Sequence, residues 1–175
     1  MPSKKLSEIN LNEAFGFATI LAAIEGIRAT FAKEFKNIEI APALFLVYFT
    51  AFRIKMYLDD DGHDFKSSKA PDIFIALISW LAFLISVSAL TTSVALAVKW
   101  TLVAIGVSTL WILYTIIATG KPKIWRMLWF GLMNVFHCIG LTLGLNQPSL
   151  WVIIFPVLTA LVFVDSIVTR EKFNN

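Results

Sequence analysis

Residues 94–119 read VALAVKWTLVAIGVSTLWILYTIIAT and contain one charged side chain, Lys99. An α-helix needs about 20 mostly apolar residues to cross the hydrocarbon core of a bilayer, and this segment exceeds that length. Comparable apolar segments lie on both sides of it, separated by short polar loops. The segment therefore predicts one membrane-spanning helix among several.

The composition of the whole chain leads to the same class. Of its 175 residues, 58% are apolar and 15% are charged, and the mean hydropathy is +0.75. Soluble domains are roughly 45–50% apolar and about 25% charged, so these values argue strongly against a water-soluble enzyme. The single cysteine, Cys138, excludes an intrachain disulfide.

Six apolar runs can be drawn, and we expect each to form a helix. They cover residues 13–31, 40–58, 72–91, 94–119, 124–145 and 149–169. The first run carries Glu25 and Arg28, so it could instead lie in the membrane interface as an amphipathic helix. The predicted fold is an all-α transmembrane bundle formed by residues 1–175, with six spans, or five if the first run is interfacial.

Two prolines help to place the ends of these helices. Pro42 is expected in the first turn of the second run, where its missing N–H costs little. Pro148 belongs to residues 146–149, which are expected to form a tight hairpin between the fifth and sixth runs.

The distribution of Lys and Arg predicts the orientation. With six spans and the N-terminus inside, eleven of these residues face the cytoplasm and four face outward, which satisfies the positive-inside rule. If the first run does not span, the division becomes nine to six. We therefore expect both termini in the cytoplasm, residues 59–70 as a short acidic cytoplasmic loop, and a location in the plasma (inner) membrane.

Ionisable side chains within membrane spans are costly unless paired or hydrated, and they are candidates for function. Counting from the inner helix ends places Glu25 and His137 at similar depth, with Arg28 one turn farther out. Arg53 and Asp165 share a level nearer the cytoplasm. We therefore expect two polar layers, Glu25/His137/Arg28 and Arg53/Asp165.

Simpler explanations exist for each of these residues. Glu25 and Arg28 are three residues apart and could pair with each other. Arg53 could extend to the cytoplasmic surface or form a structural ion pair with Asp165. His137 could be a packing residue that bonds to a neighbouring helix.

Small residues accompany two of the polar positions. Glu25 continues a stripe of alanines on the first run, so we expect it to face a close helix contact within the bundle or between subunits. The stripe consists of Ala14, Ala18, Ala22 and Ala29. On the fifth run Asn134 and His137 share a side with Gly140 and Gly144, for which ordinary close packing is the simplest explanation.

The most polar segment follows the second run and contains Asp59, Asp60, Asp61 and Asp64. It does not fit an EF-hand, because placing Gly62 at loop position six puts Tyr57 and Ser68 where acidic ligands belong. We expect a solvated loop that could attract cations to a pore mouth, and we predict no metal site and no cofactor.

Sequence motifs of hydrolases, zinc enzymes and nucleotide-binding loops are missing from the chain. We therefore expect no enzyme. The net charge of +3 fits cytoplasmic loops rather than a nucleic-acid partner. Trp100, Trp125 and Trp151 lie near predicted helix ends and are expected to anchor the protein at the membrane interface.

These observations favour a small channel or pore subunit that forms a homo-oligomer in the lipid bilayer and passes an inorganic ion or a small solute. A symmetric oligomer would turn one polar residue per subunit into a ring. The expected pore or ligand-binding residues are Glu25, Asn134 and His137, with Arg28, Arg53 and Asp165 as charge partners. If His137 gates conduction, flux should change between about pH 5 and 8.

Two alternatives remain. Six helices with both ends inside, in a chain of this length, resemble the vitamin-binding S components of energy-coupling-factor transporters. Ala18-x-x-x-Ala22 is similar to the small-residue motif by which those subunits dock their partner. The resemblance implies a transporter subunit with a tightly bound small molecule, although the acidic loop departs from that pattern. The third possibility is a non-conducting effector or interaction protein of a stress or defence system.

Overall fold

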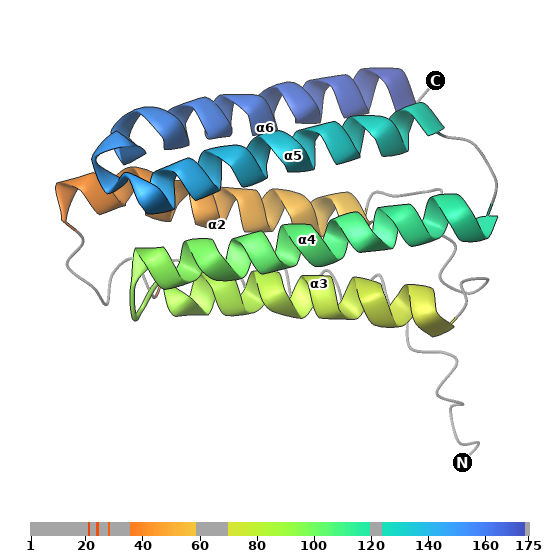
Figure 1. Ribbon diagram of the computed structural model, residues 1–175, viewed down its shortest axis with the longest axis horizontal. Coiled ribbons are helices and arrows are strands. Elements are labelled where there is room, and N and C mark those ends of the chain that lie inside the picture. Colours follow the sequence, from red (N-terminus) through yellow and green to blue (C-terminus); the bar gives the residue numbers. More distant parts are fainter. Residues whose placement is uncertain are drawn as a thin grey trace, which may run out of the picture.

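A computed structural model describes residues 36–58, 70–119 and 124–173, together with Leu21, Ile24 and Arg28. Its five long helices lie side by side, and successive helices run in opposite directions (Figure 1). They are α2 (Asn37–Leu58), α3 (Ala70–Ala89), α4 (Val94–Thr119), α5 (Ile124–Asn146) and α6 (Trp151–Phe173). A short 3-10 helix, η2 (Pro148–Leu150), joins α5 to α6, and no strand occurs among the described residues. The expected all-helical class is therefore confirmed for this part of the chain.

The helix ends agree with the apolar runs to within a few residues. The largest shifts are at the start of α2 and at the end of α6. Because α2 begins at Asn37, Pro42 lies inside the helix rather than in its first turn, which corrects the expectation for that residue. The Glu39 carboxylate accepts a hydrogen bond from the Lys36 backbone N–H at 3.1 Å, and this capping interaction starts the helix before the apolar run begins.

Contacts between neighbouring helices close a ring in the order α3, α4, α5, α6 and α2. The most extensive contact joins α3 to α4, and α2 packs mainly on α6. Small polar side chains line the α3–α4 contact: the Ser86 hydroxyl lies 2.9 Å from the Ala97 carbonyl oxygen and 2.5 Å from the Thr101 hydroxyl. Small residues let two membrane helices approach closely, and these hydrogen bonds join the pair.

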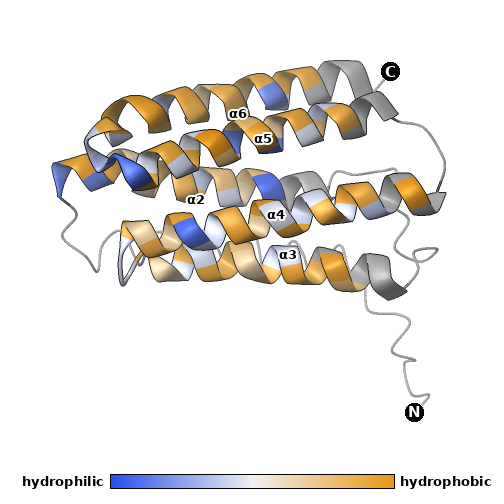
Figure 2. Ribbon diagram, viewed as in Figure 1, coloured by the Kyte–Doolittle hydropathy of each residue, from blue (hydrophilic) through white to orange (hydrophobic). Residues whose placement is uncertain are grey.

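The outer surface of the described helices is apolar, unlike the surface of a soluble protein. Apolar residues predominate along all five helices (Figure 2), and each helix exposes large apolar side chains. Examples are Leu44, Phe74, Leu110, Ile139 and Ile153. Arg53, Asn134, His137 and Asp165 are buried instead. Such a surface suits lipid rather than water.

Length and composition point to the same environment. Three segments of the described chain are long and apolar enough to cross a membrane: Val94–Tyr114, Leu128–Asn146 and Pro148–Val168. A shorter apolar stretch covers Leu77–Ala89. The expected membrane-embedded helical character is therefore supported, while the number of spans and the position of the termini stay predictions.

Candidate functional site

The centre of the helix ring contains a hydrogen-bonded chain of three polar side chains from three helices. The Arg53 guanidinium on α2 donates a hydrogen bond to the Asn134 side-chain oxygen on α5. The Asn134 amino group then donates to the Thr109 hydroxyl on α4 at 2.9 Å. Arg53 and Asn134 are 4% and 1% exposed, so the chain lies within the bundle rather than on its surface.

One phenylalanine of α2, Phe49, lies between this chain and His137. The Arg53 guanidinium carbon lies 5.0 Å from the centre of the Phe49 ring, and the Phe49 ring stacks on the His137 imidazole at a centroid distance of 4.7 Å. The Phe45 ring is also roughly parallel to the imidazole, at 6.2 Å. Cation–π and aromatic stacking contacts thus connect the guanidinium to the imidazole through Phe49.

The protonation state of each imidazole nitrogen follows from its surroundings. His137 Nδ1 lies 2.6 Å from the Met133 carbonyl oxygen, one turn earlier on α5. A carbonyl oxygen can only accept, so Nδ1 carries the proton and, in the neutral ring, Nε2 has a free lone pair. His137 is 0% exposed, and Nε2 has no hydrogen-bond partner among the described residues.

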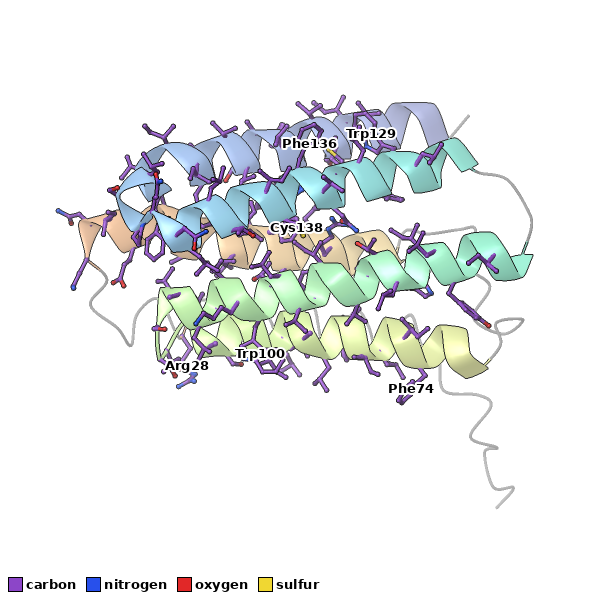
Figure 3. The ribbon with its side chains drawn as sticks, in the orientation of Figure 1. Arg28, Phe74, Trp100, Trp129, Phe136 and Cys138 are labelled. Atoms are coloured by element: carbon purple, nitrogen blue, oxygen red, sulfur yellow. The ribbon has the colours of Figure 1, made fainter. Side chains whose placement is uncertain are left out.

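Asp165 on α6 occupies a neighbouring position in the interior. It is 0% exposed, and one of its carboxylate oxygens accepts a hydrogen bond from the Trp129 indole N–H at 2.6 Å. Trp129 lies on the part of α5 that runs beside α6 (Figure 3). Trp129 precedes Asn134 by five residues, so Asp165 and Arg53 attach to α5 about 7–8 Å apart along its axis.

Apolar and aromatic side chains fill the bundle on the other side of His137, toward the end formed by η2. The Phe45 ring lies 5.3 Å from Phe155, whose ring meets Trp151 edge-on at 6.2 Å. Leu141, one turn beyond His137 on α5, is completely buried. Within the described residues, the charged and amide side chains therefore lie on one side of His137, while the interior between α2 and α6 on the other side is apolar.

The structure brings together some of the predicted site residues. One cluster contains Arg53, Asn134 and His137. It joins Arg53 of the expected inner layer to His137 of the expected outer layer, so these two layers are continuous at the residues that can be compared. The guanidinium of Arg53 points inward to Asn134 instead of extending to the helix end. Arg28 is exposed at the end of the molecule where α3 turns into α4 (Figure 3).

Other predicted residues lie outside the described part of the chain. They are Glu25, Asp59, Asp60, Asp61 and Asp64, together with the alanine stripe of the first run. Among the described residues, no group of three or more acidic, histidine or cysteine side chains could hold a metal ion.

The remaining glycine and tryptophan predictions can be compared with the packing. A Cβ on Gly140 would lie 2.6 Å from a methyl carbon of Leu158, so this glycine permits the close α5–α6 contact, as ordinary packing requires. Trp151 is 5% exposed and packs over Gly144, so its predicted role as an interfacial anchor is wrong. The glycine makes room for the indole in the core, which a helix-end position alone did not reveal.

Sequence reasoning missed three residues that contact the buried polar side chains. Thr109 and Trp129 gave no signal of their own, because a threonine and a tryptophan are common in apolar helices. Phe49 lies one turn before Arg53, and that spacing is the signal that could have identified it. No known protein family matches this chain, and neither a curated protein nor a solved structure shows significant similarity to it.

Proposed function

We propose that this is an integral membrane protein with six spanning helices and both termini in the cytoplasm, and that it passes an ion or a small solute through its own helix bundle. The observation that carries the proposal is the buried cluster of Arg53, Asn134 and His137 inside helices with apolar outer faces. Polar groups at membrane depth are costly, and in membrane proteins they commonly line a path for a solute.

The burial of the cluster favours a path inside each subunit. Asn134 and His137 are 1% and 0% exposed in the single chain, so they face the interior of the ring rather than a neighbouring subunit. A ring of His137 side chains around an oligomer axis would require α5 to rotate. A homo-oligomer of this protein would therefore carry one path per subunit.

The one-sided polarity suggests how the path is closed. The buried charged and amide side chains Arg53, Asn134 and Asp165 lie on the side of His137 toward the C-terminal part of α2, which the positive-inside rule places toward the cytoplasm. Phe45, Phe155 and Leu141 fill the half beyond His137. Apolar constrictions exclude water and ions until they widen, so these side chains serve as the gate in this proposal.

The test is flux of K⁺, Na⁺, H⁺ and Cl⁻, and of small neutral solutes, through purified protein in liposomes. Asn134→Leu removes the amide that joins Arg53 to Thr109, and we expect it to reduce or abolish flux. Val135→Ala is the matched control, because Val135 is the next residue on α5 and faces outward with 54% exposure. Glu25→Gln tests the predicted role of the first run.

Two results would decide against conduction. Well-inserted protein that passes none of these species is not a channel. A small molecule that stays bound during purification and native mass spectrometry would favour the substrate-binding subunit of a transporter. The complete burial of the polar side chains inside the bundle supports that alternative. A silent protein without a ligand would favour an effector or interaction protein.

A further inference from the structure

We propose that the start of α6 is the moving part of the gate: residues 148–155 swing outward about Pro156 and lift Trp151 out of the bundle. This inference rests on the proposed conduction function and specifies how the same site is opened and closed. It follows from the packing of the segment, from the indole N–H of Trp151 and from two features that weaken α6 in its second turn.

Few side chains attach residues 148–155 to the bundle. The 3-10 helix η2 lies at the end where α5 turns into α6, and none of its residues is buried (Figure 1). In the first turn of α6, Trp151 and Phe155 are buried and Ile154 is half-buried. The two aromatic rings are therefore the main contact between this segment and the interior.

These two rings close the interior between α2, α5 and α6. The Phe155 ring lies 5.3 Å from the Phe45 ring of α2. A Cβ on Gly144 of α5 would lie 3.0 Å from the Trp151 indole and 3.3 Å from the Phe155 ring, so both rings pack against the glycine backbone. Outward movement of the segment would separate α6 from α2 and α5 at this end of the bundle.

The closed position leaves the indole N–H of Trp151 without a hydrogen bond. Trp151 is 5% exposed, and its Nε1 has no hydrogen-bond partner among the described residues. A buried donor without a partner carries the cost of its desolvation. At the membrane interface, a tryptophan ring stays in apolar surroundings while its N–H reaches water. The closed and outward positions are therefore closer in free energy than burial of the ring alone would make them.

Two residues weaken α6 next to this segment. Pro156 has no backbone N–H, so the Val152 carbonyl oxygen loses the donor that it would have in an uninterrupted helix. The Thr159 hydroxyl donates a hydrogen bond to the Phe155 carbonyl oxygen at 2.8 Å, a contact that often bends a helix. Sharp bends in helices concentrate at such positions. Bending at Pro156 therefore costs less than bending elsewhere in α6.

The first experiment measures flux in proteoliposomes of the full chain, with the same ions and neutral solutes that test conduction. Gly144→Ala adds the Cβ for which the two rings leave no room, so it should push the segment outward and raise flux several-fold. Gly131→Ala is the matched control on α5, because a Cβ there would meet no atom within 4 Å. It should leave flux unchanged.

A second variant acts in the opposite direction. Pro156→Ala restores the N–H that the Val152 carbonyl oxygen lacks and stiffens α6, so it should reduce flux several-fold. Alanine favours a helix, so this variant is expected to fold. Pro42→Ala removes a helix proline of α2 that lies outside the moving segment, and it should change flux little.

A measurement on the segment itself does not require conduction. Full-length protein labelled with 5-fluorotryptophan in lipid nanodiscs gives ¹⁹F signals from six tryptophans, and Trp151→Phe identifies the signal of Trp151. We expect two Trp151 signals, of which a water-soluble paramagnetic complex broadens only the weaker. Gly144→Ala should strengthen the weaker signal, and Pro156→Ala should reduce it.

The outcomes separate the two proposals. Two Trp151 signals in a protein that passes no solute would support the outward movement and overturn conduction. A single Trp151 signal, shielded from the paramagnetic complex in Gly144→Ala as well as in the unsubstituted chain, would overturn the movement even if the protein conducts. Flux that neither Gly144→Ala nor Pro156→Ala changes would overturn the role of this segment as the gate.

Discussion

The Asn134 side chain forms hydrogen bonds with residues of two different helices. Its oxygen accepts from the Arg53 guanidinium, and its amino group donates to Thr109 at 2.9 Å. A guanidinium stays protonated under all ordinary conditions, so Arg53 cannot lower the cost of its burial by losing its charge. The carboxamide is thus an acceptor that Arg53 needs in the interior, since a buried charge without hydrogen bonds is strongly destabilising.

We predict that Asn134→Leu, which preserves the approximate volume, lowers the free energy of unfolding by about 2–3 kcal/mol. Thr109→Val removes only the neutral end of the chain and should cost about 1 kcal/mol. The measurement is unfolding in detergent micelles, followed by circular dichroism. Val135→Leu, on the outer face, should have little effect, and equal losses for Asn134→Leu and Val135→Leu would contradict the assigned role.

Helix α5 contains three glycines in different surroundings, and the difference shows what holds α5 to α6. A Cβ on Gly140 would lie within 3.1 Å of three carbon atoms at the end of Leu158, which is itself buried. A Cβ on Gly131 would have no neighbour within 4 Å. The same residue type therefore serves close helix packing at one position and no packing at the other.

Alanine substitutions at these two positions should have opposite effects on stability. Gly140→Ala should destabilise the protein by about 1 kcal/mol, because overpacking outweighs the gain in helix propensity. Gly131→Ala should stabilise it by about 0.5–1 kcal/mol, because only the propensity changes. Parallel thermal melts of both variants are sufficient. Stabilisation by Gly140→Ala would mean that Leu158 relaxes freely and that the α5–α6 contact is loose.

The helices themselves could be predicted well from sequence, because continuous apolar runs interrupted by Pro, Gly and charged residues mark their limits. The close contact between α3 and α4 was not predicted, although Ala97 and Thr101 lie four residues apart on α4, which is the spacing of a packed face. The packing role of the α5 glycines is visible in sequence because glycine is unusual within a helix. Serine and alanine give a weaker signal, as they are common on every face.

The described helices bury charged side chains such as Arg53 and Asp165 and carry large apolar side chains on their outer faces. Thr92 in the α3–α4 turn and Ser149 in η2 lie at the same end of the bundle and are exposed (Figure 1). Residues 120–123 follow α4 and precede α5, so they belong to the other end of the bundle. In a membrane, Thr92 and Ser149 therefore have to lie on the same side.

Cysteine labelling in intact cells tests this arrangement together with the proposed orientation. In a Cys138→Ala background, Thr92→Cys and Ser149→Cys should both react with a membrane-impermeant maleimide added outside. Lys123→Cys should react only after the membrane is permeabilised. Labelling of residues 92 and 149 from different sides would contradict the bundle, and the reverse pattern for all three would invert the orientation.

The site was harder to predict than the bundle. The depth of His137 and the unusual presence of Arg53 could be read from their positions in apolar runs. Their contacts could not, because the residues that join them come from α2, α4 and α5, and the rotation of each helix about its axis is set by packing. His137 and Asn134 lie on one face by their spacing, but only the folded chain shows that Phe49 and Arg53 meet that face.

The hydrogen bond between Arg53 and Asn134 also has a consequence for the synthesis of the protein. The two residues are 81 positions apart in the chain. At about 5–20 residues per second, a ribosome needs roughly 4–16 seconds to make the intervening segment. In a chain that enters the membrane during translation, α2 therefore waits for several seconds before the acceptor on α5 exists. Its guanidinium has to stay near water or the insertion machinery during that time, so α2 completes its insertion late, after helices that follow it in the sequence.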